Sequence, residues 1–154
     1  MPEKEVISNL LKSCRREPPR KQAELAQEIH ISRKQVSSLE LKKANPSMSI
    51  LKKIAAYRGL SLAELLWTNK QSPCPPCGDL LPEQIMAVRV MRFRVKNKIS
   101  QELFAERAGI SVSLLSRIEN SKAAPCLDVL QNLARHMDIT VAELFIPCEE
   151  EDGK

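Results

Sequence analysis

Three neighbouring side chains, Arg33, Lys34 and Gln35, carry the most specific chemistry in this chain. Arg can bind guanine through O6 and N7 together, and Gln can bind adenine through N6 and N7. Ser32 precedes the three residues and is a good N-cap, so they should lie in the first turn of a helix over residues 33–40. The N-terminal end of a helix usually enters the DNA major groove. The cluster therefore indicates DNA readout.

A second candidate site is Cys74-Pro-Pro-Cys77, which has the spacing of half a zinc knuckle. A structural zinc needs four ligands, and the sequence holds no second C-x-x-C. Two chains could share one zinc through four such thiolates, and Cys126 and Cys148 could contribute, but we expect free thiols and no cofactor. The sequence has no nucleophile–base pair, phosphate loop or paired-carboxylate site, so we do not expect an enzyme.

Basic residues concentrate in the first half of the chain. Residues 1–70 hold 14 Lys or Arg against 7 Asp or Glu, whereas residues 71–154 hold 10 against 12. The first half is therefore the better candidate to bind a polyanion. Aromatic residues make up only 3%, and the apolar residues fall at helical spacing, which favours an all-α protein. No apolar run approaches the roughly 20 residues of a membrane span. Five Cys, an odd number, favour a reducing, cytoplasmic location.

The sequence repeats with a shift of 79 residues, and this repeat predicts the domain count. Residues 22–66 (copy one) align with residues 101–145 (copy two) without a gap, and the matches fall at core, cap and turn positions. Such a period holds several helices, so it indicates two copies of one small domain. We expect an N-terminal domain over 1–67, a Pro- and Cys-containing linker over 68–81, a C-terminal domain over 82–147 and an acidic tail over 148–154.

Each of the two domains is expected to form five short helices. In copy two, Ser100 and Ser111 cap two helices joined at Gly109, where a left-handed residue costs least. Two short helices joined by such a turn form a helix-turn-helix. His30 replaces this glycine in copy one, so we expect a strained or slightly reshaped turn there. His136, on the fourth helix of copy two, is expected at the surface.

Both copies resemble the Cro/cI repressor family, also called the XRE family. The resemblance is carried by the pattern S-Q-E…A-E-R-A-G-I-S…L-L-S-R-I-E-N…P in copy two, and it extends to copy one. It implies two tandem five-helix, lambda-repressor-like helix-turn-helix domains that bind double-stranded DNA with the third helix in the major groove. It also implies a transcription regulator of bacterial or phage type, most simply a repressor.

The resemblance further implies a set of DNA-contacting residues in each copy. In copy one these are Gln22, Arg33, Lys34, Gln35, Ser38, Lys42 and Lys43, and in copy two they are Gln101, Ser113, Arg117 and Lys122. Family members often pair an Arg in helix 1 with the Glu that ends helix 3. Arg15 with Glu40, and Arg94 with Glu119, share the same separation of 25 residues and are expected to be structural ion pairs.

The third helix of copy two is less polar, because it presents Val112 and Leu114. Two apolar side chains on a solvent face indicate either thymine contact or a protein interface. We therefore expect copy one to read sequence, while copy two binds a neighbouring half-site or forms a homodimer. The 14 residues of the expected linker reach roughly 43 Å when extended, against roughly 34 Å between half-sites.

Two other functions stay open at this point. One is an autoregulating antitoxin of a toxin–antitoxin pair. The other is a protein-interaction module, an anti-activator that uses the helix-turn-helix fold of the C-terminal domain to bind another regulator.

Overall fold

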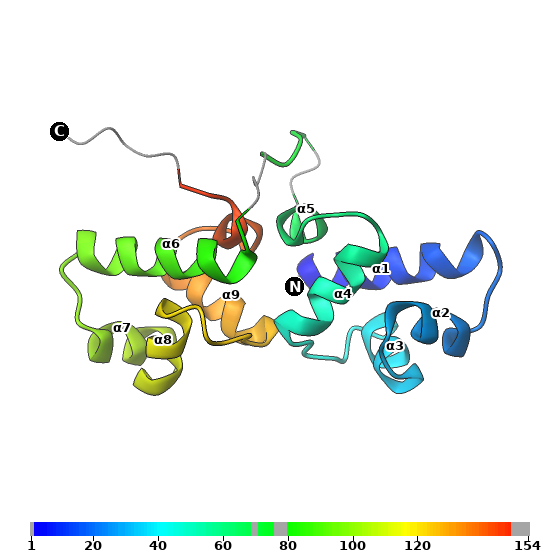
Figure 1. The fold of residues 1–154 in the computed structure, drawn as a ribbon, viewed down its shortest axis with the longest axis horizontal. Helices are drawn as coiled ribbons and strands as arrows, with labels where there is room; N and C mark the ends of the chain where they lie inside the picture. Colours follow the sequence, from blue (N-terminus) through cyan, green and yellow to red (C-terminus); the bar gives the residue numbers. More distant parts are fainter. Residues whose placement is uncertain (1, 69–70, 76–79, 149–154) are drawn as a thin grey trace. The chain divides into compact units, whose positions relative to one another are not determined.

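The computed structural model describes residues 2–68, 71–75 and 80–148, and all regular elements in these ranges are helices (Figure 1). The expected all-α fold is confirmed. The chain divides into two compact units, Met1–Cys74 and Pro75–Lys154. The division falls inside the segment expected to be a linker. Among the helices of the described ranges, none is long and apolar enough to cross a membrane.

The first unit contains α1 (Pro2–Arg16), α2 (Gln22–Ile29), α3 (Arg33–Glu40), α4 (Met48–Tyr57) and α5 (Leu62–Leu66). Helix α1 packs against α2, α3 and α5, and α4 packs against α2 and α5. One apolar face of each helix supplies the core, which includes Ile7, Leu11, Leu25, Val36, Leu51, Ile54 and Leu65. This packing leaves the outer face of α3 exposed (Figure 1).

The second unit contains α6 (Pro82–Lys96), α7 (Gln101–Ala108), α8 (Val112–Glu119), α9 (Leu127–His136) and the 3₁₀ helix η1 (Ala142–Phe145). Thr140 and Glu143 form the capping box expected at its last helix, with backbone-to-side-chain distances of 2.6 and 3.3 Å. The element is a single 3₁₀ turn because Pro147 disfavours the α region for Ile146, which is extended at φ −100°.

The two units place residues in the left-handed region at matching positions. His30 (φ 65°) corresponds to Gly109 (φ 69°), and Gly59 (φ 65°) corresponds to Asp138 (φ 56°), each pair 79 residues apart. The residue after each of the first pair closes the helix-turn-helix turn with its backbone amide. Ile31 donates to the Ala26 carbonyl and Ile110 donates to the Ala105 carbonyl, both at 3.0 Å. The turn at His30 therefore keeps the shape that glycine allows, and its left-handed residue bears the strain.

His136, expected at the surface, is half-buried, with its ring packed on two aromatic neighbours. Its ring lies 4.8 Å from the ring of Phe104 and 5.8 Å from that of Phe93, measured between centroids. Its Nε2 atom is buried and has no hydrogen-bond partner in the described part of the chain. Burial lowers the pKa of His136 below its ordinary value, and the charge of Arg107 lowers it further.

Candidate nucleic-acid interface

The first turn of α3 presents two cations to solvent. Ser32 caps the helix, because its Oγ accepts from the Gln35 amide at 3.1 Å. Arg33 and Lys34 follow the cap and are exposed, and neither side chain makes a hydrogen bond or ion pair within the described residues. The N-terminus of a helix carries positive partial charge, so each cation there costs about 0.3–1 kcal/mol. The two cations therefore lower the stability of the first unit, and they are placed to bind an external anion.

Gln35 has a structural task in the same turn. The Ser32 amide donates to Gln35 Oε1 at 2.8 Å, which completes a reciprocal capping box. With this bond in place, Gln35 offers only its amide nitrogen to a base edge. Bidentate pairing with adenine would require the cap to open, because that pairing also uses the carbonyl oxygen. Ser38, one turn further along α3, is half-buried.

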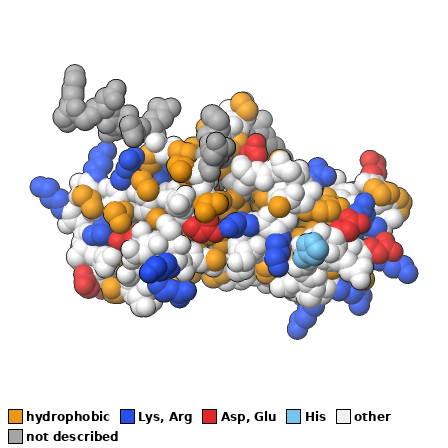
Figure 2. Space-filling view, viewed as in Figure 1, with side chains coloured by type: hydrophobic (Ala, Val, Ile, Leu, Met, Phe, Trp, Pro, Cys, Tyr) orange, Lys and Arg blue, Asp and Glu red, His pale blue; other side chains and the backbone are white. Residues whose placement is uncertain are grey.

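Two further lysines follow α3. Lys42 is exposed, and its Nζ lies 3.6 Å from Glu5 Oε1, which is exposed as well. Lys43 is exposed, and its side chain has no partner in the described residues. Figure 2 shows Lys and Arg side chains around the edge of the first unit that carries α3. Exposed ion pairs of the Lys42–Glu5 kind contribute little stability, so both lysines can turn toward a phosphate.

Glu40 ties α3 to α1 and α2. Arg15 donates to Glu40 Oε1 through Nε at 2.6 Å and to Oε2 through Nη2 at 3.0 Å. Gln22 donates its amide to Glu40 Oε2 at 2.8 Å, and Ser8 Oγ donates to the Glu40 backbone carbonyl at 2.6 Å. The Glu40 side chain is buried. Gln22, expected at DNA, therefore has its amide nitrogen engaged inside the unit, and the network fixes the direction of α3.

The second unit repeats this network. Arg94 donates to Glu119 Oε1 at 2.6 Å and to Oε2 at 3.1 Å, and Gln101 donates to Oε2 at 2.8 Å. The hydrogen bonds to the Glu119 carboxylate raise the pKa of Arg94. Ala87 stands where Ser8 stands in copy one. Both ion pairs separated by 25 residues are thus present, and Gln101 is engaged like Gln22.

The outer face of α8 is less cationic than that of α3. Val112 and Ser113 are exposed at the positions of Arg33 and Lys34, whereas Leu114 is half-buried. Arg117 and Lys122 are exposed, and Arg117 Nη2 lies 3.5 Å from the Lys122 carbonyl, a long hydrogen bond. A single large apolar side chain, Val112, therefore faces solvent on this helix.

A zinc site at Cys74 and Cys77 falls partly outside the described residues, because Cys77 lies among residues 76–79. Within the described ranges, His, Cys, Asp and Glu residues form no group of three or more that could hold a metal ion.

Comparison with known proteins identifies the fold of both units. A helix-turn-helix family model matches the chain twice, over residues 11–65 and 90–144. YazB, an uncharacterised HTH-type transcriptional regulator of Bacillus subtilis, is 36% identical over 64 residues, which cover 42% of this chain and 93% of that protein. An uncharacterised HTH-type transcriptional regulator of Archaeoglobus fulgidus is 32% identical over 66 residues, which cover 43% of this chain and 93% of that protein. The crystal structure of a hypothetical transcription factor, NHTF from Neisseria, matches with a TM-score of 0.41 and 23% identity, over 47% of this chain and 82% of its own.

Proposed function

This chain belongs to the XRE-type helix-turn-helix family of DNA-binding transcription regulators, and we propose that its first unit reads DNA sequence with α3. The observation that carries the proposal is the position of Arg33 and Lys34 in the first turn of that helix. Both cations face solvent, and both lie where the helix dipole opposes them. Arg33 is the residue we assign to a guanine edge, because a guanidinium can bind O6 and N7 together.

Around this reader, the remaining side chains of copy one bind the phosphate backbone. Lys34, Lys42 and Lys43 supply the charge. We assign the half-buried Ser38 and the amide nitrogen of Gln35 to contacts at the edge of the groove. Each neutralised phosphate releases about 0.9 counterion, so binding weakens steeply as salt rises. Gln22 positions α3 through Glu40, and its carbonyl oxygen has no role in this scheme.

The second unit has a supporting role on DNA. Ser113, Arg117 and Lys122 contact the backbone of a neighbouring half-site, and Gln101 holds Glu119 as Gln22 holds Glu40. Val112 gives α8 an apolar contact in place of the Arg33 cation. We assign the chain the role of a repressor, because a protein that only occupies DNA can block transcription without a further activity.

The test is a salt titration of binding to the promoter region of the protein's own gene. Arg33→Ala should weaken specific binding roughly 5- to 150-fold, which corresponds to the loss of one bidentate base contact. Lys34→Ala should weaken binding to all sequences and reduce the salt slope by about one. Arg117→Ala should have a smaller effect than Arg33→Ala.

If both copy-one variants bind the specific site as the wild type does, the first unit is not the reader. If Arg117→Ala alone abolishes specific binding, the roles of the two units are reversed. The absence of a shift with any genomic DNA, together with co-purification of a protein, would favour an anti-activator.

A further inference from the structure

Helix α6 carries an apolar stripe that faces away from the core of the second unit. Its exposed fractions are 58% at Leu81, 45% at Val88, 41% at Met91 and 63% at Val95. Gln84 is exposed as well, and it falls between Leu81 and Val88. The five positions are then separated by 3, 4, 3 and 4 residues along the chain. That is the a/d seam of a heptad, the pattern that packs one helix against another. The opposite face of α6 supplies the core with Ile85, Met86, Ala87 and Val90. We call the five exposed positions the α6 seam.

The first unit shows that the fold does not require this seam to be apolar. The same positions of α1, 79 residues earlier, are Pro2, Glu5, Asn9, Lys12 and Arg16. Helix α1 nevertheless buries the same inner face, with Ile7 and Leu11 in the core. Polar or charged residues thus occupy four of these five outward positions in the first copy, whereas apolar residues occupy four of the five in the second, where Gln84 is the polar one. A contiguous exposed apolar stripe of this kind marks a contact surface.

Elsewhere, the described residues offer little that matches the α6 seam. The first unit exposes one large apolar side chain, Leu41, within its described part. In the second unit, Leu80 lies beside the seam, and Leu103 and Val112 stand apart on other helices. A second copy of this chain brings an identical stripe with the same heptad spacing. We propose that two copies of this chain pair through their α6 seams, with the two helices antiparallel.

The charges along α6 favour the antiparallel direction. The helix has Glu83 in its first turn and Lys96 in its last turn, and Arg92 lies exposed near the same basic end. An antiparallel pair brings the acidic end of each helix to the basic end of the other and opposes the helix dipoles, whereas a parallel pair superposes like charges. In the antiparallel register, Val88 of one copy packs against Met91 of the other, and Val95 packs against Gln84.

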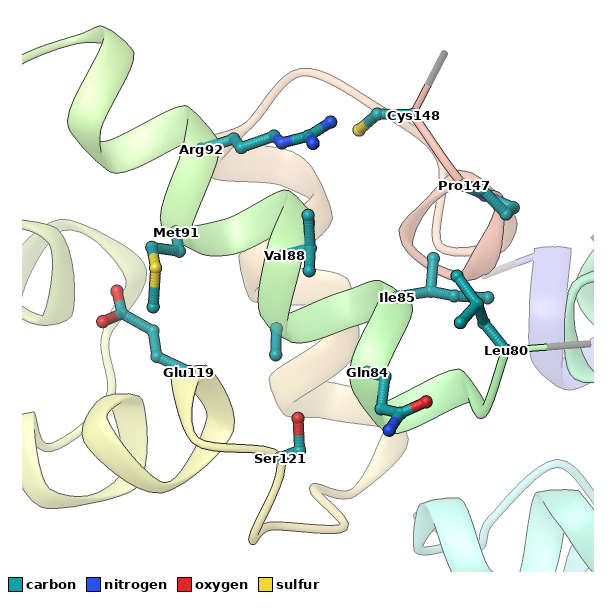
Figure 3. A pocket seen from close by; sticks show the side chains of 11 residues that line it. Leu80, Gln84, Ile85, Val88, Met91, Arg92, Glu119, Ser121, Pro147 and Cys148 are labelled. Atoms are coloured by element: carbon teal, nitrogen blue, oxygen red, sulfur yellow. The ribbon is translucent and has the colours of Figure 1, made fainter. Parts of the chain in front are cut away.

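A groove of about 510 Å³ runs beside the seam and gives the partner helix room for its side chains. Figure 3 shows Met91 and Glu119 at one end of this groove and Leu80 and Pro147 at the other. Figure 2 shows hydrophobic side chains gathered over α6. A single helix pair is a small interface, below about 1,200 Å² in total, so the dimer should be reversible and depend on concentration.

The first unit provides a matched substitution for the test. The triple variant Val88→Asn, Met91→Lys, Val95→Arg places the residues of α1 on α6, and the first copy shows that this fold accepts them. Sedimentation equilibrium of the full chain over a concentration series should show the wild type rising from single-chain mass toward twice that mass. The triple variant should stay at single-chain mass. The single variant Met91→Lys should weaken the association at least tenfold, and it serves if the triple variant fails to fold.

The control is Val112→Arg, which places the copy-one residue at the matching position of α8 and should leave the association unchanged. A wild-type chain that stays at single-chain mass at every concentration would overturn the proposal. So would a triple variant that folds and associates as the wild type does. Dissociation by Val112→Arg alone would place the interface on α8. Pairing through α6 does not depend on which unit reads DNA, so either result leaves the DNA assay interpretable.

Discussion

Replacing both Arg33 and Lys34 with alanine should stabilise the first unit while it weakens DNA binding. Each cation lies in the first turn of α3, where the dipole penalty is about 0.3–1 kcal/mol. Alanine leaves no cavity, because both side chains are exposed. Arg, Lys and Ala have similar helix propensities, so the exchange adds little else. The double variant should therefore gain about 0.6–2 kcal/mol in unfolding free energy. Opposite effects on stability and binding are expected of residues kept for function.

The first unit contains an intrinsic fluorescence probe for its own unfolding. Trp67 is the single Trp of the chain, and its Nε1 donates to the Ser72 carbonyl at 2.9 Å. Urea unfolding followed by Trp fluorescence thus reports on the first unit, and the midpoint should rise with an unchanged slope. The control double variant, Val112→Ala with Ser113→Ala, changes the same two helix positions of the second unit and should leave this transition alone. A lower midpoint for the Arg33, Lys34 variant would contradict this prediction, because it would show that the two cations stabilise α3.

Three further predictions concern the scaffold. His30→Gly removes the cost of a left-handed non-glycine residue and should raise the unfolding free energy of the first unit by about 1 kcal/mol; an unchanged Trp-detected midpoint would show that the turn bears no strain. Glu119→Ala removes the acceptor of Arg94 and Gln101 and should lower the unfolding free energy of the second unit by about 2–4 kcal/mol. Urea unfolding followed by far-UV circular dichroism measures this loss. A loss below about 1 kcal/mol would show that the network contributes no more than a surface ion pair. Burial lowers the pKa of His136, so the second unit should be most stable above the ordinary value of 6.5 and lose stability as the pH falls through 6.5 toward the folded-state pKa. His136→Phe should reduce the difference in thermal midpoint between about pH 7.5 and about pH 5.5, and an equal difference in both proteins would contradict this pKa shift.

The fold could be predicted from the sequence because its local signals agree with one another. Ser32, Ser61 and Ser111 cap the helices that the periodicity indicates. The shift of 79 residues then transfers each assignment from one copy to the other. The last element escaped prediction in part. A capping box specifies where a helix starts, but Pro147 decides whether η1 continues as an α-helix.

The candidate interface was harder to predict, because a Gln side chain can hydrogen-bond inside the protein as well as to DNA. The spacing of Gln22 and Gln35 on their helices suits DNA contact, but the same side chains reach Glu40 and the Ser32 amide. The partner of Gln22 depends on how α2 packs against α3, which a single sequence does not give, whereas the bond of Gln35 to the Ser32 amide is a local capping box of the S-x-x-Q kind. The role of Arg33 and Lys34 was easier to predict, since a cation at a helix N-terminus does not stabilise the folded unit.

The α6 seam was missed although a signal for it exists. Helix α6 is apolar on two faces, and the helical periodicity of the buried face, which includes Ile85 and Val90, masks the periodicity of the exposed one. Comparison of the outward positions with those of α1 would have separated the two faces, because Asn9 and Lys12 replace Val88 and Met91 there. The partial burial of His136 was missed for another reason. Its aromatic neighbours come from α6 and α7, and no local pattern around a lone His reports them.

Selection of binding sites from random DNA tests the central claim, that α3 of the first unit reads sequence, most directly. The wild-type chain, Arg33→Ala and Arg117→Ala would be run side by side at one salt concentration, so that the preferred sequence rather than the affinity is compared. Arg33→Ala should lose the preference for guanine at one position of the selected site, while Arg117→Ala should keep the wild-type sequence with weaker binding. A site that is unchanged in Arg33→Ala and altered only in Arg117→Ala would show that α3 is not the reader.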